Sequence, residues 1–173
     1  SWSRTLVRVM FICGGCIAIL LPAWLPNRPE APVETGTIEL LQAELRNLTC
    51  PVIVDLGTGS GAIALAVKHA CPRATVVGVD ASAPALAVAQ GNAARLGLNV
   101  ALHVGNWWDC AALRPLLGHI DVVISNPPYI RDDDPCLQDA GLRHEPRHAL
   151  ASGADGLDAL RRIAAAAPAH LVA

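Results

Sequence analysis

A short run of stiff and polar residues, 125–130 (SNPPYI), follows the β-branched apolar run 120–124, which is typical of a buried strand. Each proline fixes φ and lacks an N–H, so the carbonyls of this turn stay outside helices and ladders. The Asn126 amide adds one acceptor and two donors, and Tyr129 adds a flat face. Such a turn can hold an NH2 group of a planar substrate, although the same residues also suit an ordinary Asn-Pro turn.

A glycine-rich stretch at 55–61 (DLGTGSG) is the second candidate site. Alternate glycines let the backbone turn sharply and approach a ligand, and the helix expected next offers free N–H groups. A dinucleotide fold uses G-x-G-x-x-G for its pyrophosphate. The spacing here suits a ligand with a carboxylate, an ammonium and no phosphate, such as S-adenosylmethionine, or a plain strand–helix turn. The residues expected to bind that cofactor are Asp55, Gly57, Thr58, Gly59, Ser60 and Gly61.

Two further residues could contact a nucleoside. Asp80 ends the next expected strand, where a carboxylate can accept both ribose hydroxyls; NAD and S-adenosylmethionine proteins share this position. Residues 105–109 (GNWWD) follow the third expected strand, and Trp107 is our candidate for stacking on adenine. The alternatives are a surface aspartate at a strand end and two rings that close the end of the sheet.

These residues are separated by a regular alternation of strands and helices, which predicts a Rossmann-like, doubly wound parallel α/β sheet. Pro84 in the first turn of one helix and Gly97 at its end support that helix. We expect the strand before the turn to lie beside the first strand, so that the turn faces the glycine loop. The expected strands are 51–56, 74–79, 99–104 and 121–125; the expected helices are 62–70, 83–96 and 156–170, with a short one at 113–117.

Composition limits the classes of function. The 173 residues suffice for one domain, and a net charge of −2 argues against a nucleic-acid binder that relies on a basic surface. Six scattered cysteines indicate the reduced thiols of a cytoplasmic protein. The CxxC at 13–16 has no second pair or histidine cluster beside it, so we expect no metal site. Residues 142–147 and the aspartates at 132–134 are interpreted as solvated loop, and His148 is given no acid–base role.

Residues 1–47 fit poorly with the rest and are treated as an atypical apolar segment and linker ahead of a partial domain at 48–173. The apolar run 6–25 is near the length of a membrane span and, with two arginines before it, resembles a signal peptide. The interpretation we favour is a segment foreign to the domain, from a shifted or truncated reading frame. Residues 26–36 are expected to be a linker and 37–47 a short helix.

Several motifs together resemble the release factor glutamine N5-methyltransferases, the HemK-like family, over about residues 50–171. They are DLGTGSGAIALA, VVGVDAS, the Asn-Trp pair, SNPPYI, GLRHEPRHAL and SGADGLDALRRI. Asn-Pro-Pro-Tyr alone is shared with adenine-N6 DNA methyltransferases and some RNA methyltransferases. The downstream EP-x-x-AL and SGADGL strings favour the glutamine branch.

The resemblance implies a class I methyltransferase fold and a role for each matching residue. Residues 57–61 would hold the methionine part of S-adenosylmethionine, Asp80 the ribose and Trp107 the adenine. The substrate would be the glutamine in the Gly-Gly-Gln loop of a peptide chain release factor. Its side-chain amide would be held by Asn126 and the Pro127 carbonyl, within a substrate-binding turn that also includes Pro128 and Tyr129. The catalytic residues would be Asn126, Pro127 and Tyr129, and Asn126 would also contact the cofactor.

The chain departs from that family at both ends. Of the family's N-terminal part, only residues 25–30 (LPNRPE) faintly resemble its I-P-R-P-E-x-E segment, and we expect the chain to lack the N-terminal helical domain. The chain also stops before the remaining strands of the sheet, so we expect a bare edge on the strand 121–125. Three alternatives therefore stay open: an adenine-N6 nucleic-acid methyltransferase, an inactive methyltransferase-fold fragment, and a domain anchored to a membrane through 6–25.

Overall fold

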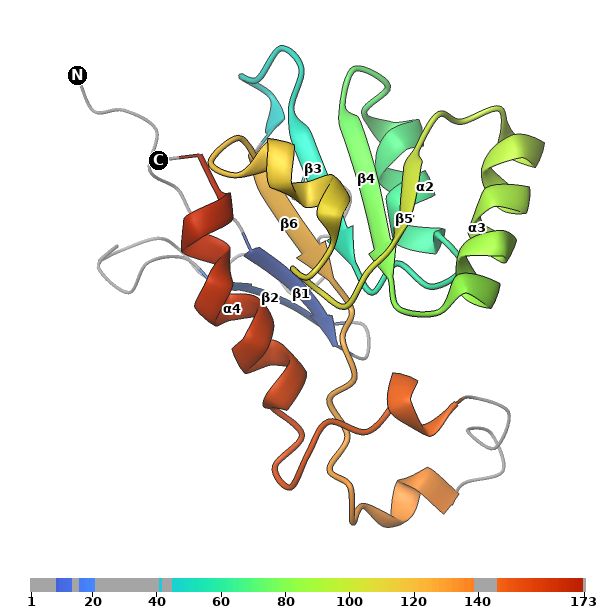
Figure 1. Cartoon of the computed structure of the whole chain (residues 1–173), viewed down its shortest axis with the longest axis vertical. Coiled ribbons are helices and arrows are strands. Elements are labelled where there is room, and N and C mark those ends of the chain that lie inside the picture. The colour runs from blue at the N-terminus through green and yellow to red at the C-terminus, as the bar shows by residue number, and fades with distance from the viewer. Residues whose placement is uncertain (1–8, 14–15, 21–40, 42–44, 139–145, 173) are drawn as a thin grey trace.

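The computed structural model describes residues 9–13, 16–20, 41, 45–138 and 146–172. They form one six-stranded sheet with the order β2-β1-β6-β3-β4-β5 (Figure 1). Every neighbouring pair is parallel except β1 and β2, so the predicted parallel sheet is confirmed. The strands are β1 Val9–Cys13, β2 Cys16–Leu20, β3 Val52–Leu56, β4 Thr75–Asp80, β5 Ala101–Val104 and β6 Val122–Ser125.

The helices lie where the sequence places them. Helices α2 (Ala62–Ala70) and α3 (Ala83–Leu96) have the predicted bounds, and Gly97 ends α3 in the left-handed conformation. Helix α4 (Asp158–His170) begins later than the expected start at residue 156, ends at the expected residue and includes Pro168. Three 3₁₀ helices complete the described elements: Ala111–Leu116, Pro135–Gln138 and Arg147–Ala149. The first of them replaces the short helix expected at 113–117.

Alternate residues of a strand point to opposite faces of the sheet, and residues 53–56 of the central strand β3 are buried on both faces. On β3, Ile53 packs with Val67 of α2 in one cluster, whereas Val54 packs with Ile163 of α4 in the other. All four of these side chains are fully buried. In Figure 1, α4 therefore covers one face of the sheet and α2 the other, as a doubly wound fold requires.

The edge of β6 is paired, and the expectation of a bare edge is wrong. Strand β1 lies parallel to β6, with Val9 opposite Val123 and Phe11 opposite Ser125, and β2 folds back beside β1. Because every residue of β6 is buried, its outer N–H and C=O groups need hydrogen-bond partners. The apolar residues near the start of the chain provide that strand (Figure 1).

The rest of the N-terminal segment is described only in part. The linker expected at 26–36 lies outside the described residues, as does most of the helix expected at 37–47, of which Leu41 and Leu45 are helical and buried. Among the described residues, no helix has the length and apolar character that crossing a membrane requires.

Candidate active site

The glycine loop joins β3 to α2 and is tied to the neighbouring strand. The amides of Gly57 and Thr58 both donate to the carbonyl of Val79, at 2.8 and 3.0 Å. Gly57, Gly59 and Gly61 have φ values of +74°, +56° and +81°, which residues with a side chain rarely adopt. The alternating glycines thus make a tight turn at the carboxyl end of β3.

The side chain of Asp55 stabilises this loop from inside the fold. Its side chain is fully buried, and Oδ2 accepts a 2.7 Å hydrogen bond from the Thr58 hydroxyl. Oδ1 has no hydrogen-bond partner within the described part of the chain. Burial raises the pKa of Asp55 to about 6, and hydrogen bonds from Thr58 and the Ala64 amide offset only part of this effect. Asp55 therefore acts on the loop through Thr58.

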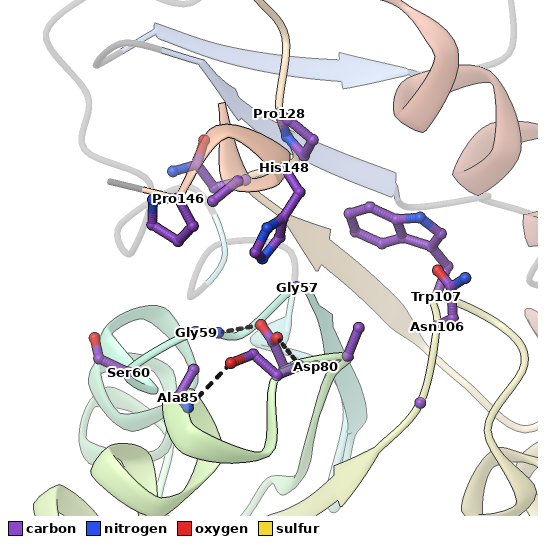
Figure 2. Close-up of a pocket in the computed structure, with 15 residues that line it drawn as sticks. Gly57, Gly59, Ser60, Asp80, Ala85, Asn106, Trp107, Pro128, Pro146 and His148 are labelled. Carbon is purple, nitrogen blue, oxygen red and sulfur yellow. Dashed lines mark hydrogen bonds between the residues drawn. The ribbon is translucent and has the colours of Figure 1, made fainter. Parts of the chain in front are cut away.

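Asp80 connects the loop to the start of α3 (Figure 2). Its Oδ2 accepts from the Gly59 amide at 2.7 Å, and its Oδ1 accepts from the Ser82 amide at 2.8 Å. Each carboxylate oxygen has two lone pairs, so each can accept one further hydrogen bond from a ligand. The geometry therefore leaves Asp80 able to receive two hydroxyl groups.

The two tryptophans have different surroundings. Asn106 and Asp109 exchange backbone hydrogen bonds of 3.0 and 3.1 Å, which closes a tight turn around them. Trp107 has a φ of +55° within this turn. A Cβ placed on Gly57 would lie only 3.1 Å from Cζ3 of Trp107, so the indole lies close to the glycine loop.

Trp108 packs the other way, toward α4. Its Nε1 donates to the carbonyl of Ile163 at 2.9 Å, and its ring stacks on His170 with centroids 4.1 Å apart. Trp108 therefore closes the end of the sheet, and Trp107 alone of the pair faces the ligand side.

The turn after β6 lies beside the glycine loop. Ser125 is opposite Leu56 in the parallel ladder, and its buried hydroxyl donates to the Leu56 carbonyl at 2.6 Å. Asn126 is exposed and Pro127 is buried. Within the described residues, neither the Asn126 amide group nor the Pro127 carbonyl makes a hydrogen bond. A ligand that binds them would therefore displace no internal hydrogen bond.

A cavity of about 620 Å³ brings the predicted elements together (Figure 2). Seven of the residues singled out in the sequence line it: Gly57, Gly59, Ser60, Asp80, Trp107, Asn126 and Pro128. Five others do not: Asp55, Thr58 and Gly61 belong to the loop behind it, and Pro127 and Tyr129 to the turn. Tyr129 is 41% exposed.

The cavity has a wall that the sequence interpretation missed. Pro146, His148 and Ala149 line it, and Figure 2 shows His148 facing the glycine loop. Pro146 belongs to the stretch 142–147 that was interpreted as solvated loop, and His148 and Ala149 were given no site role. The long-range bridge between Ile130 and Ala151 brings this wall to the turn. The other unpredicted lining residues are Ala81, Ser82, Ala85, Gly105 and Asn106. Gly105 and Asn106 could have been found as neighbours of Trp107.

The floor of the cavity is bare backbone. A Cβ built on Gly59 would meet no atom within 4 Å, so this residue faces open space. A ligand can reach the main chain here and the Asp80 carboxylate beside it. The described residues contain no group of three or more His, Cys, Asp or Glu arranged to hold a metal ion.

Comparison with known families agrees with this arrangement. Residues 30–145 match the model of the methyltransferase small domain. The chain belongs to the methyltransferase small domain family. The match includes the glycine loop, Asp80, both tryptophans and the Asn-Pro-Pro-Tyr turn.

Curated relatives of this methyltransferase-domain chain carry a more specific name, and they confirm the resemblance. It is 44% identical over 153 residues to a release factor glutamine methyltransferase of Bordetella pertussis, covering 86% of this chain and 56% of that protein. It is 50% identical over 145 residues to one from Xylella fastidiosa, covering 83% and 50%. The chain thus spans about half the length of the curated relatives it matches.

Solved structures also align. TrmN from Thermus thermophilus is 28% identical, with a TM-score of 0.41, over 54% of this chain and 29% of that chain. The assignment of the methyltransferase domain to the Rossmann-like class rests on its own strand order and on the family match.

Proposed function

We propose that this chain contains the cofactor-binding and catalytic part of a release factor glutamine methyltransferase, which transfers a methyl group from S-adenosylmethionine to a glutamine side-chain amide. One observation carries the proposal: a single cavity joins the glycine loop and Asp80 to Asn126 and Pro128 of the turn. The names of the relatives favour a release factor as the acceptor over adenine in nucleic acid. Release factors act in translation, so the proposed location is the cytoplasm.

The cavity fits the cofactor in three places. Gly57, Gly59 and Ser60 offer backbone to its amino-acid part, since Gly59 has open space where a side chain would stand. The free lone pairs of Asp80 suit the two ribose hydroxyls. The indole of Trp107 suits the adenine as a stacking partner. When bound, S-adenosylmethionine supplies an electrophilic methyl carbon on a positively charged sulfur.

The turn would orient the acceptor. An amide nitrogen is a poor nucleophile because its lone pair is delocalised into the carbonyl. The Asn126 side-chain oxygen and the Pro127 carbonyl would accept its two hydrogens, which aims the lone pair at the methyl carbon. As the nitrogen–carbon bond forms, the carbon–sulfur bond breaks and its electron pair stays on sulfur. The two oxygens stabilise the positive charge that grows on nitrogen until it loses a proton to water.

The prolines suit this task because they hold the oxygens in place before the substrate arrives. Neither Asn126 nor Pro127 forms a competing hydrogen bond within the described part of the chain, so binding the amide breaks no internal contact. Tyr129 would pack near the acceptor from its exposed position and could face the developing charge. In this proposal no residue of the turn serves as a general base.

The test is to separate binding from transfer in Asn126→Ala. Titration with S-adenosylmethionine gives the cofactor affinity, and single-turnover transfer to a purified release factor gives the rate. We expect the affinity to stay within about threefold and the rate to fall about 100-fold or more, as for removal of one oriented stabilising group. A variant that loses cofactor binding but keeps its rate at saturation would contradict the role of the turn.

A further inference from the structure

Residues 130–132, which follow the turn, are hydrogen-bonded to residues 150–153. The Ile130 amide donates to the Leu150 carbonyl at 2.9 Å, and the Ser152 amide donates to the Ile130 carbonyl at 2.8 Å. Two residues later, the Asp132 amide donates to the Gly153 carbonyl at 3.0 Å. These hydrogen bonds place residues 152–158 (SGADGLD), which we call the bracing loop, next to the turn.

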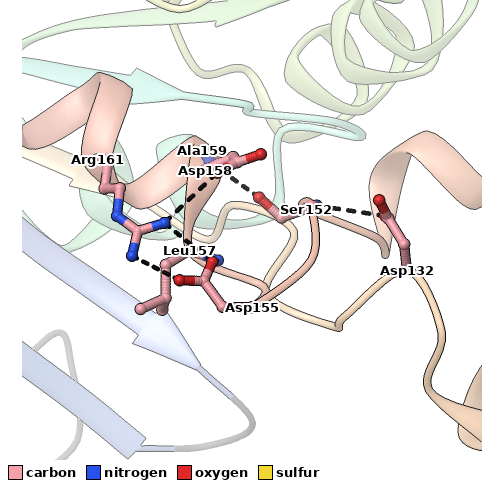
Figure 3. Close-up of polar contacts among 8 residues, drawn as sticks. Asp132, Ser152, Asp155, Leu157, Asp158, Ala159 and Arg161 are labelled. Atoms are coloured by element: carbon pink, nitrogen blue, oxygen red, sulfur yellow. Dashed lines mark hydrogen bonds and ion pairs between the residues drawn. The ribbon is translucent and has the colours of Figure 1, made fainter.

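The bracing loop is also attached to α4 (Figure 3). The buried Ser152 hydroxyl accepts from the Ala159 amide at 2.8 Å. Arg161 of α4 pairs with the Asp155 carboxylate, with one contact of 2.9 Å. Because Ile163 on the same helix is fully buried in the core, the loop is attached to a rigid part of the fold.

Gly156 is the point where the bracing loop meets the turn. A methyl group on Gly156 would overlap the Tyr129 carbonyl oxygen and lie 3.1 Å from the carbonyl carbon. The φ of Gly156 is +77°, which independently favours glycine. The Tyr129 peptide therefore rests directly on the bare Cα of Gly156, with no room for a side chain between them.

We propose that the bracing loop sets the position of the catalytic turn, and that Gly156 is a positioning residue for the amide-holding oxygens. This inference rests on the proposed function for its catalytic consequence, although the contact itself does not. Pro127 and Pro128 stiffen the backbone between Tyr129 and Asn126. A displacement of the Tyr129 peptide would therefore move the two oxygens relative to the glycine loop. Misplacement of reacting groups by about 1 Å can cost about 100-fold in rate.

The test compares Gly156→Ala with Gly118→Ala. Gly118 also has a positive φ, +70°, but a Cβ there meets nothing within 4 Å, and it precedes β6 at the end opposite the turn. Both variants strain the backbone at a positive φ, but only Gly156→Ala should displace Tyr129, so comparing the two variants separates these effects. Tyr129 is the only tyrosine of the chain, so ¹³C-tyrosine labelling gives a single set of ring signals by NMR.

We expect Gly156→Ala to shift the Tyr129 ring signals and to lower kcat for methyl transfer about 10- to 100-fold, with cofactor affinity within about threefold. Gly118→Ala should leave the signals, the kcat and the affinity unchanged. Ser152→Ala, which removes the hydrogen bond to Ala159 and leaves the Asp155–Arg161 pair, should shift the same signals by less; it stands in if Gly156→Ala does not fold.

Two results would overturn the inference: ring signals that stay in place in the folded variant, or signals that move while kcat keeps its wild-type value. Failure of the proposed function looks different. In that case the wild-type chain transfers no methyl group to a release factor. The Tyr129 signals then still report whether the bracing loop holds the turn.

Discussion

The buried Asp55 carboxylate predicts an unusual dependence of stability on pH. Its pKa is about 6 in the folded chain and 3.8 ordinarily. One pKa unit corresponds to about 1.4 kcal/mol, so the charged form costs the folded state about 3 kcal/mol. Because the folded state binds this proton more tightly, the group makes stability fall as pH rises from about 4 to above 6. The cost is complete at pH 7.

The assay is urea denaturation of the wild type and Asp55→Asn between pH 4 and pH 8. Asparagine carries no charge, so the stability of Asp55→Asn relative to wild type should increase by about 2.5 kcal/mol across this range, since part of the full effect already lies below pH 4. Any altered hydrogen bonding with Thr58 adds a constant that does not depend on pH. Only the change with pH therefore tests the argument.

Asp133→Asn is the matched control, because it removes an aspartate from the surface, where the side chain is 74% exposed. Its curve controls for the loss of a carboxylate as such. Parallel curves for wild type and Asp55→Asn would refute the reasoning, since they would mean that the Asp55 carboxylate titrates alike in the folded and unfolded chain.

Three further predictions concern the glycine loop, the hydrogen bond between Ser125 and Leu56, and the edge of β6. Gly59→Ala should cost about 1 kcal/mol of stability and lower cofactor affinity, measured by calorimetry, about tenfold or more. Gly97→Ala, also at positive φ in open space, should leave cofactor affinity unchanged. Equal affinities of the two variants would refute the claim that the cofactor approaches the bare backbone at Gly59. Ser125→Ala should lower the free energy of unfolding by about 1–3 kcal/mol, because the Leu56 carbonyl loses its buried partner; no loss in denaturation would contradict this. Without residues 1–20, the outward amides of β6 should exchange hydrogen about tenfold faster or more; unchanged exchange would exclude the β1 pairing.

The parts of the site that depend on residues close together in the sequence could be predicted. The glycine loop, the helix behind it and the residue at the end of β4 follow from local turn chemistry and strand periodicity. The position of Asn126 beside the loop follows from the usual order of strands in a doubly wound sheet.

Long-range pairings outside that usual strand order could not be predicted. His148 reaches the cavity only because Ile130 pairs with Ala151, about twenty positions along the chain. The pairing of β1 with β6 joins residues more than a hundred positions apart, and an apolar run alone does not distinguish such a strand from a membrane span. Trp107 and Trp108 are chemically alike in the sequence and differ only in what packs against each.

The most direct test of the central claim is to incubate the chain with labelled S-adenosylmethionine and purified release factor, and to locate the methyl group by peptide mass spectrometry. A release factor with glutamate replacing the glutamine of its Gly-Gly-Gln loop, and an adenine-containing oligonucleotide, are the comparison acceptors. The account predicts one methyl group on the side-chain amide of that glutamine and none on either comparison acceptor. A chain that binds the cofactor but methylates the oligonucleotide, or the substituted factor as well as the natural one, would contradict it.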